Sequence, residues 1–182
     1  MTRGPVLARW ARACVREELG GDAPARPTDP WCEEPGATFV TLRWLRGELQ
    51  GCIGSIRQHR AIVDDVARNA VAAATRDSRG QRLALPDVDR LDVEVSILSA
   101  LEAIAHGSEE EMWAAITPGR DGVVLEYEDY RGVLLPVVWE KLPTRPAFAE
   151  ALKHKAGLAR TFWHANVRLF RYSVEHAVDR AR

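Results

Sequence analysis

A chain of 182 residues, with 46% hydrophobic and 28% charged residues, has a globular composition and enough length to bury a core without metal or disulfide links. Its formal net charge of -1, with lysine and arginine scattered, argues against a nucleic-acid-binding surface. The sequence has no run of 18 apolar residues, and residues 1–19 carry many charges, unlike a signal peptide. We therefore expect a cytoplasmic protein with no membrane segment.

Thiol and imidazole side chains are few and dispersed. The cysteines are Cys14, Cys32 and Cys52, and the histidines are His59, His106, His154, His164 and His176. The cysteines form no Cys-x-x-Cys pair, and the histidines show no spacing typical of a metal site. We therefore expect no disulfide framework, no metal and no cofactor.

The first quarter of the chain predicts a helix and then a loop. Apolar residues follow Pro5 at helical spacing as far as Gly20, which places Cys14 on the buried side. Residues 22–36 carry four prolines together with acidic residues. This segment predicts an irregular surface loop that holds Cys32.

A hairpin is predicted next. From Thr38 to Trp44 apolar residues alternate with the period of a strand, residues 46–48 provide a reversal, and residues 49–55 return beside the first strand. Gly51 and Gly54 weaken an ordinary strand, so a local cause for two glycines is expected.

The central segment predicts one helix and one strand. In residues 60–76, Ile62, Val66 and Asn69 fall on one narrow arc of a helix. A loop follows, and Leu91–Leu98 then alternates like a half-buried strand.

The remaining residues predict four further elements. Ser108 and Glu111 form a capping box for a short helix over 109–117. The other three are a hairpin of 122–128 with 132–138, in which Pro136 marks an edge strand, a helix capped by Thr144 and ended by Gly157, and a last strand over 167–174. Hairpins mixed with helices favour an α+β fold with antiparallel sheets and flanking helices.

Cys52 is the sharpest candidate for chemistry. Its flanking residues Gly51 and Gly54 lack side-chain bulk, which would let a ligand approach the sulfur and the nearby backbone amides. Such a thiol can act as a nucleophile if a neighbouring cation favours the thiolate. The alternative is a small buried hydrophobe on a strand, since free cysteine is among the most buried residue types.

Three polar residues are candidate ligand-binding groups. Asn69 lies on an apolar helix arc, so it either meets a polar cleft or clasps a neighbouring loop. Arg79 either binds an anionic group or lies in solvent at the end of its helix. Glu94 either serves as a general base or lies on the solvent-facing side of a sheet.

An ordered series of motifs resembles the AMMECR domain, a family named for a human chromosomal region deleted in a contiguous-gene syndrome. The hallmark of that family is Leu-Arg-Gly-Cys-Ile-Gly-Thr, which Leu49-Gln50-Gly51-Cys52-Ile53-Gly54-Ser55 resembles. The other matching segments are Phe39-Val40-Thr41-Leu42, Asn69-Ala70, Asp77-x-Arg79, Val93-Glu94-Val95-Ser96-Ile97-Leu98, Leu101-Glu102, Gly119-x-Asp121-Gly122, Leu134-Leu135-Pro136, Lys155-Ala156-Gly157-Leu158 and Trp163.

The resemblance implies one domain over residues 1–182 with two lobes. The larger lobe would come from the N- and C-terminal segments and the smaller from the middle of the chain, with the hallmark segment near a cleft between them. It further implies a possible enzymatic role without a settled reaction, and Memo-like and radical-SAM proteins as partners.

Three positions depart from the family pattern. Gln50 replaces the hallmark arginine, Gly80 replaces an aromatic residue, and Val137 replaces a polar one. Two hypotheses follow. In the first, the protein is an enzyme acting on a small polar substrate, with Cys52 as nucleophile or redox thiol. In the second, it is a binding module without chemistry of its own that acts with Memo-like and radical-SAM proteins.

Overall fold

The computed structural model describes residues 2–105 and 107–181, and the chain divides into two compact units. The first unit comprises Met1–Leu98 and Glu175–Arg182, and the second comprises Ser99–Val174. Each unit combines antiparallel strand pairs with helices, so the fold is α+β. The expected cleft between lobes stays a prediction.

The sheet of the first unit has the strand order β2-β1-β4-β9, and the short β3 pairs with the start of β1. Strand β1 lies antiparallel to both β2 and β4. The strands are β1 Pro35–Trp44, β2 Leu49–Gly54, β3 Arg60–Ala61, β4 Leu91–Leu98 and β9 Val174–Asp179.

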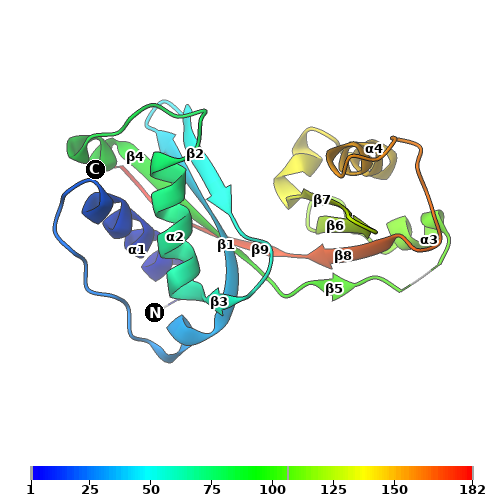
Figure 1. Cartoon of the computed structure of the whole chain (residues 1–182), viewed down its shortest axis with the longest axis horizontal. Helices are drawn as coiled ribbons and strands as arrows, with labels where there is room; N and C mark the ends of the chain where they lie inside the picture. The colour runs from blue at the N-terminus through cyan, green and yellow to red at the C-terminus, as the bar shows by residue number, and fades with distance from the viewer. Residues whose placement is uncertain (1, 106, 182) are drawn as a thin grey trace. The chain divides into compact units, whose positions relative to one another are not determined.

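Two helices, α1 Arg3–Glu18 and α2 Ile62–Thr75, cover the same side of this sheet (Figure 1). Alternate strand residues point to opposite faces, so Val40 and Leu42 of β1 join the core beneath the helices. Thr41 points the other way. We call the side turned away from α1 and α2 the Thr41 face.

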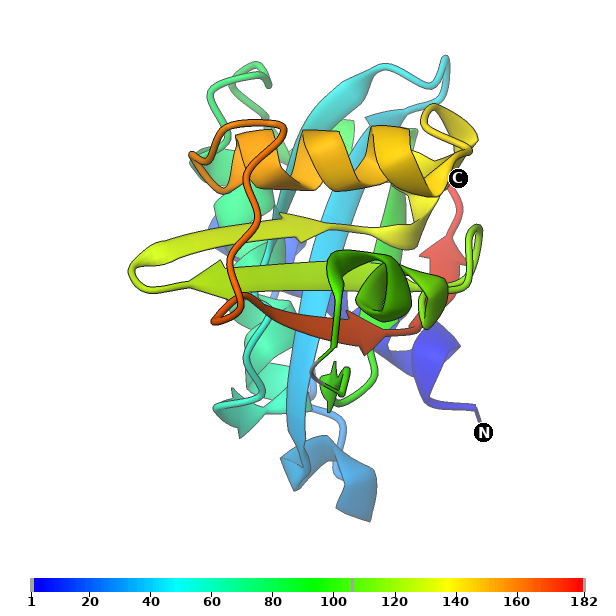
Figure 2. The same cartoon turned by 90° about the vertical axis from the view of Figure 1, so that its right-hand side faces the viewer.

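The second unit has the strand order β5-β8-β6-β7. Figure 2 shows α4 running alongside β6 and β7. Ser108 and Thr144 cap α3 and α4 through their side chains, as the sequence predicted. The elements are β5 Glu102–Ala103, α3 Glu109–Ala114, β6 Gly122–Tyr127, β7 Tyr130–Leu134, α4 Arg145–Lys155 and β8 Arg168–Tyr172.

Most predicted elements of the first unit are confirmed. The first hairpin forms, the central helix spans Ile62–Thr75, and strand β4 spans Leu91–Leu98. The predicted loop over 22–36 is wrong in one respect. A 3-10 helix, Pro30–Glu33, turns Cys32 inward, and that residue is fully buried.

Two predictions for the second half of the chain need correction. Pro136 does not lie in an edge strand; it begins a 3-10 helix, Pro136–Glu140, because its ring fixes φ near the helical value and the hairpin already ends at Leu134. The last predicted strand ends at Tyr172, and a separate strand, β9, returns to the first unit's sheet. Another 3-10 helix, Leu85–Arg90, precedes β4, and no helix among the described residues has the length and apolar character to cross a membrane.

Candidate functional site

Cys52 lies in the middle of edge strand β2, directly opposite Thr41. The Thr41 hydroxyl donates a hydrogen bond to the Cys52 sulfur over 3.2 Å. The Cys52 side chain is partly exposed, whereas Cys14 and Cys32 are buried. The sulfur therefore has a fixed polar neighbour on the Thr41 face.

Asp77 and Arg79 satisfy the outer backbone groups of this edge strand. The Cys52 N–H donates to Asp77 Oδ2 (2.8 Å), and Arg79 Nη2 donates to the Cys52 carbonyl oxygen (3.3 Å). Both backbone groups thus point away from β1, as in the narrow type of antiparallel pair, which brings the Thr41 and Cys52 side chains close together. Two side chains replace the missing neighbour strand.

The Asp77–Arg79 pair is itself doubly hydrogen-bonded. Arg79 Nε donates to Asp77 Oδ1 (2.9 Å), and Nη2 donates to Oδ2 (2.6 Å). The Arg79 guanidinium, and after it the Cys52 N–H, hold the pKa of Asp77 well below its ordinary value. Asp77 in turn raises the pKa of Arg79. The guanidinium is thus held by Asp77 next to the backbone of Cys52.

The two glycines of the hallmark segment are explained by close packing within the chain. A Cβ at Gly51 would lie 2.0 Å from the backbone oxygen of Ala73 in α2, and a Cβ at Gly54 would lie 2.2 Å from the Phe39 ring. The space that these glycines leave is occupied by the chain's own atoms. The expectation that it admits a ligand is therefore wrong at both positions.

Gln50 occupies an irregularity in the β1–β2 ladder. The register shifts between Leu42 and Arg43, which pair with Gly51 and Leu49, so Gln50 is the extra residue of a β-bulge. Its side chain is 1% exposed, accepts from Trp44 Nε1 (3.1 Å) and donates to the Gln81 carbonyl oxygen (2.7 Å).

Asn69 is placed away from Cys52, in a buried network on the other side of β1. Its amide nitrogen donates to the Thr38 carbonyl oxygen (2.9 Å) and to Asp65 Oδ2 (3.0 Å). Asp65 also accepts from the N–H and hydroxyl of Thr38 (both 2.8 Å) and from the Ser55 hydroxyl (2.7 Å). Because these polar groups find their hydrogen-bond partners within the chain, the Asn69 side chain acts as a structural clasp that links α2 to β1.

Glu94 lies on the Thr41 face, since it pairs with Thr41 across β1 and β4. Its carboxylate lies 3.0 Å from Nδ1 of His176 on β9, and the Ser96 hydroxyl lies 3.1 Å from the same nitrogen. Strands are about 4.8 Å apart, which places Glu94 and Cys52 about 10 Å apart on one face of the sheet. They can therefore contact one small molecule but not each other.

The other two thiols lie in environments that oppose ionisation. Burial, with a contribution from the charge of Glu17, raises the pKa of Cys14 to about 12. Burial, then the charge of Asp29, raises the pKa of Cys32. Neither contacts another cysteine.

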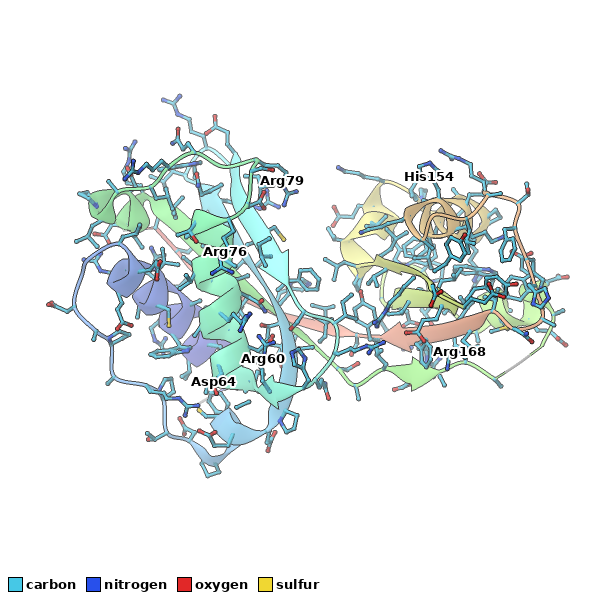
Figure 3. The ribbon with its side chains drawn as sticks, viewed as in Figure 1. Arg60, Asp64, Arg76, Arg79, His154 and Arg168 are labelled. Atoms are coloured by element: carbon cyan, nitrogen blue, oxygen red, sulfur yellow. The ribbon has the colours of Figure 1, made fainter. Side chains whose placement is uncertain are left out.

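A groove of about 740 Å³ opens where the β1–β2 turn meets the segment after α2 and the Leu85–Arg90 helix. Its lining includes Trp44, Arg46, Gln50, Arg79, Gln81 and Arg90. We call it the hairpin groove. Figure 3 shows Arg79 beyond the end of α2 and next to β2.

Sequence reasoning missed three residues of these clusters: Thr41, Asp65 and His176. Asp65 had a usable signal, since it lies one helical turn before Asn69. His106 lies outside the described residues. Among residues 2–105 and 107–181, no group of three or more histidine, cysteine or acidic side chains is placed to hold a metal ion.

The comparisons with known proteins agree with this architecture. The family model described as AMMECR1 matches residues 8–177. A protein of Thermofilum pendens is 33% identical over 97% of this chain and 89% of its own length, and Protein MJ0810 of Methanocaldococcus jannaschii is 33% identical over 96% and 89%. The crystal structure of an uncharacterized protein, PH0010, from Pyrococcus horikoshii superimposes with a TM-score of 0.83 at 32% identity, covering 95% of this chain and 89% of that one. The chain belongs to the AMMECR1 family.

Proposed function

We propose that the protein is an enzyme that acts on a small polar substrate through Cys52 as the nucleophile. The observation that carries the proposal is the contrast among the three thiols. Cys52 alone is partly exposed; its sulfur accepts a hydrogen bond from the Thr41 hydroxyl, and its carbonyl oxygen accepts one from the Arg79 guanidinium. A hydroxyl donor and a nearby cation both stabilise the negative charge of a thiolate.

The surroundings favour a nucleophilic role over a dithiol redox role. An intramolecular disulfide requires a second cysteine with its Cα within about 7 Å. Cys14 lies on α1 and Cys32 in the Pro30–Glu33 helix, both in the core of the first unit. A single thiol with polar neighbours suits covalent attack on an electrophilic carbon.

In the proposed reaction, the Cys52 sulfur forms a bond to the electrophilic carbon, and the leaving group departs with the electron pair of its bond to that carbon and takes up the proton that the thiol loses. Water then attacks the same carbon, the sulfur leaves with the electron pair of the carbon–sulfur bond, and the proton lost by the water returns to the sulfur as the thiol. Glu94, held by His176, lies about 10 Å from Cys52 on the Thr41 face, so its role is to position the far end of a substrate of that length.

The test uses p-nitrophenyl acetate as a generic acylating probe. Attack by Cys52 releases p-nitrophenolate and leaves an acetyl group on the sulfur, which peptide mass mapping locates. We expect acetylation of Cys52 in the native protein, its loss in Cys52→Ala, and a rate about threefold to tenfold lower in Thr41→Val, because one hydrogen bond contributes roughly 1 kcal/mol. Absence of the adduct on native Cys52 would rule out the nucleophile.

One observation favours the binding-module alternative. Within the part of the chain that the structure describes, the sulfur is hydrogen-bonded to Thr41, and no histidine or lysine is hydrogen-bonded to it. A module that acts with Memo-like or radical-SAM proteins would keep its partner in a pull-down when Cys52 is changed to alanine. Loss of the complex in that variant would contradict a purely passive role for the thiol.

A further inference from the structure

The hairpin groove brings together three arginines from separate parts of the chain. Arg46 follows β1, Arg79 follows α2, and Arg90 ends the Leu85–Arg90 helix. The groove volume of about 740 Å³ falls in the range of small-molecule sites, roughly 300–1,000 Å³. We propose that this groove binds the anionic group of a small organic phosphate or carboxylate.

The charges of the groove support an anion. Two of its arginines are mostly exposed, with Arg79 58% and Arg90 67% accessible. Arg46 has no acidic partner among the described residues, so its charge is available to a ligand. Glu48 and Asp87 also line the groove, and Asp87 lies 4.0 Å from Arg90. Arg79 is paired with Asp77. Arg46 is therefore the groove arginine without an ion pair among the described residues, and the exposed parts of the other two guanidinium groups add hydrogen-bond donors.

A buried amide adds a directional donor. Gln50 Nε2 carries two hydrogens and donates one to the Gln81 carbonyl oxygen. The residue is 1% exposed and lines the groove, and the second N–H has no acceptor among the described residues. The Trp44 ring, 5.8 Å from the Arg90 guanidinium carbon, provides a flat apolar wall.

The position of the groove connects it with Cys52. Arg79 lines the groove and also donates to the Cys52 carbonyl oxygen, so the groove and the strand that carries Cys52 share this arginine, although Cys52 does not itself line the groove. This inference deepens the proposed function by naming the substrate class, and it rests on that function for the chemical step alone. Binding can be measured without any reaction.

The experiment is isothermal titration with two probes, pyrophosphate and citrate, at low ionic strength. We expect saturable binding of at least one probe at or below about 1 mM. Arg46→Gln and Arg90→Gln should each weaken it at least about fivefold, since charge-assisted hydrogen bonds to anions are strong. Glu48→Gln should tighten it, because a repelling carboxylate is removed.

Arg160→Gln is the matched control, since it removes the same charge from an exposed position in the second unit and should leave the affinity unchanged. Pyrophosphate binding without citrate binding indicates a phosphate ligand, and the reverse indicates a carboxylate. No saturable binding of either probe, or equal binding by Arg46→Gln and the wild type, would overturn the inference.

Cys52→Ala separates the two proposals. It should bind the probe with unchanged affinity while losing acetylation by p-nitrophenyl acetate. If the wild type binds neither probe but is acetylated at Cys52, the anion-binding proposal is wrong and the nucleophile proposal stands. If the wild type binds a probe but is not acetylated, the nucleophile proposal is wrong and the anion-binding proposal stands.

Discussion

The two ends of helix α2 hold strand β2 through two carboxylates that have different partners. Asp65, in the first turn, is completely buried and accepts hydrogen bonds from Thr38, Ser55 and Asn69. Asp77, beyond the last turn, is 5% exposed and pairs with Arg79, which is largely exposed. Asp65 also has a longer ion pair, 3.7 Å, with Arg60, and Figure 3 shows Arg60 and Arg79 at these opposite ends.

The difference separates a structural clasp from a candidate site. The chief donors to Asp65 are backbone, hydroxyl and amide groups inside the unit, so a ligand cannot replace them without opening the core. The partner of Asp77 is Arg79, a cation at the surface that also lines the hairpin groove. Arg79 is hydrogen-bonded to the backbone of Cys52, and among the described residues Cys52 is the one cysteine that is partly exposed. We infer that the Asp65 end fixes the strand and that the Asp77 end presents it to a ligand.

Removal of the buried carboxylate should have the largest effect. Asp65→Ala leaves the buried Thr38 N–H without its acceptor and removes one of the acceptors of the Asn69 amide, so we expect the free energy of unfolding to fall by roughly 3–5 kcal/mol. Urea unfolding measures it. The control is Asp64→Ala, the exposed neighbour, which loses a surface ion pair with Arg26 and should cost less than about 1 kcal/mol. Equal losses would contradict the role of Asp65.

Substitution of the two glycines of β2 should cost different amounts of stability. Gly51→Ala forces a methyl group against the backbone of α2, so we expect a loss of about 2–3 kcal/mol in unfolding free energy. Gly54→Ala meets the Phe39 side chain at its Cγ, so that side chain must change its χ1 angle; because Phe39 is only partly buried, the loss should be smaller, about 1–2 kcal/mol. The urea unfolding midpoints of the two variants give the order of the two losses. A larger loss for Gly54→Ala would show that the packing of β2 against Phe39 is tighter than its packing against α2.

The ion pair at the Asp77 end should contribute less to stability than the buried Asp65 network and should give a distinct pH dependence. The pKa of Asp77 is lowered in the fold, so its stabilising contribution is present above the ordinary pKa of about 3.9 and is lost as pH falls below it. The stability difference between the wild type and Asp77→Asn should therefore be constant from pH 7 to 5 and should narrow below about pH 4. A difference that is independent of pH would contradict the ion pair.

Sequence periodicity predicted the helices, the hairpin and strand β4, because each depends on residues near one another in the chain. It could not give the contact between Thr41 and Cys52. Trp44 N–H bonds to the Glu48 carbonyl oxygen, and counting back from this pair sets Thr41 opposite Gly51. The bulge at Gln50 shifts the register by one residue and brings Cys52 into place.

Other parts of the site depend on pairings between distant residues. His176 reaches Glu94 because β9 joins the sheet of the first unit, which local periodicity does not specify. Gln50 and Gly80, two positions that depart from the family pattern, are 30 residues apart in the sequence, and their proximity becomes visible only in the structure. A Cβ at Gly80 would lie 1.9 Å from the Gln50 carbonyl oxygen, so the two positions are in contact and constrain each other.

The most direct test of the central claim is the rate of iodoacetamide alkylation at each cysteine of the native protein, followed by peptide mass mapping. We predict that Cys52 reacts at least about tenfold faster than Cys14 and Cys32, because burial excludes the reagent from those two and opposes their ionisation, and that urea removes the difference. If Cys52 stays unmodified until the protein unfolds, the thiol is structural and the proposed enzyme has no nucleophile.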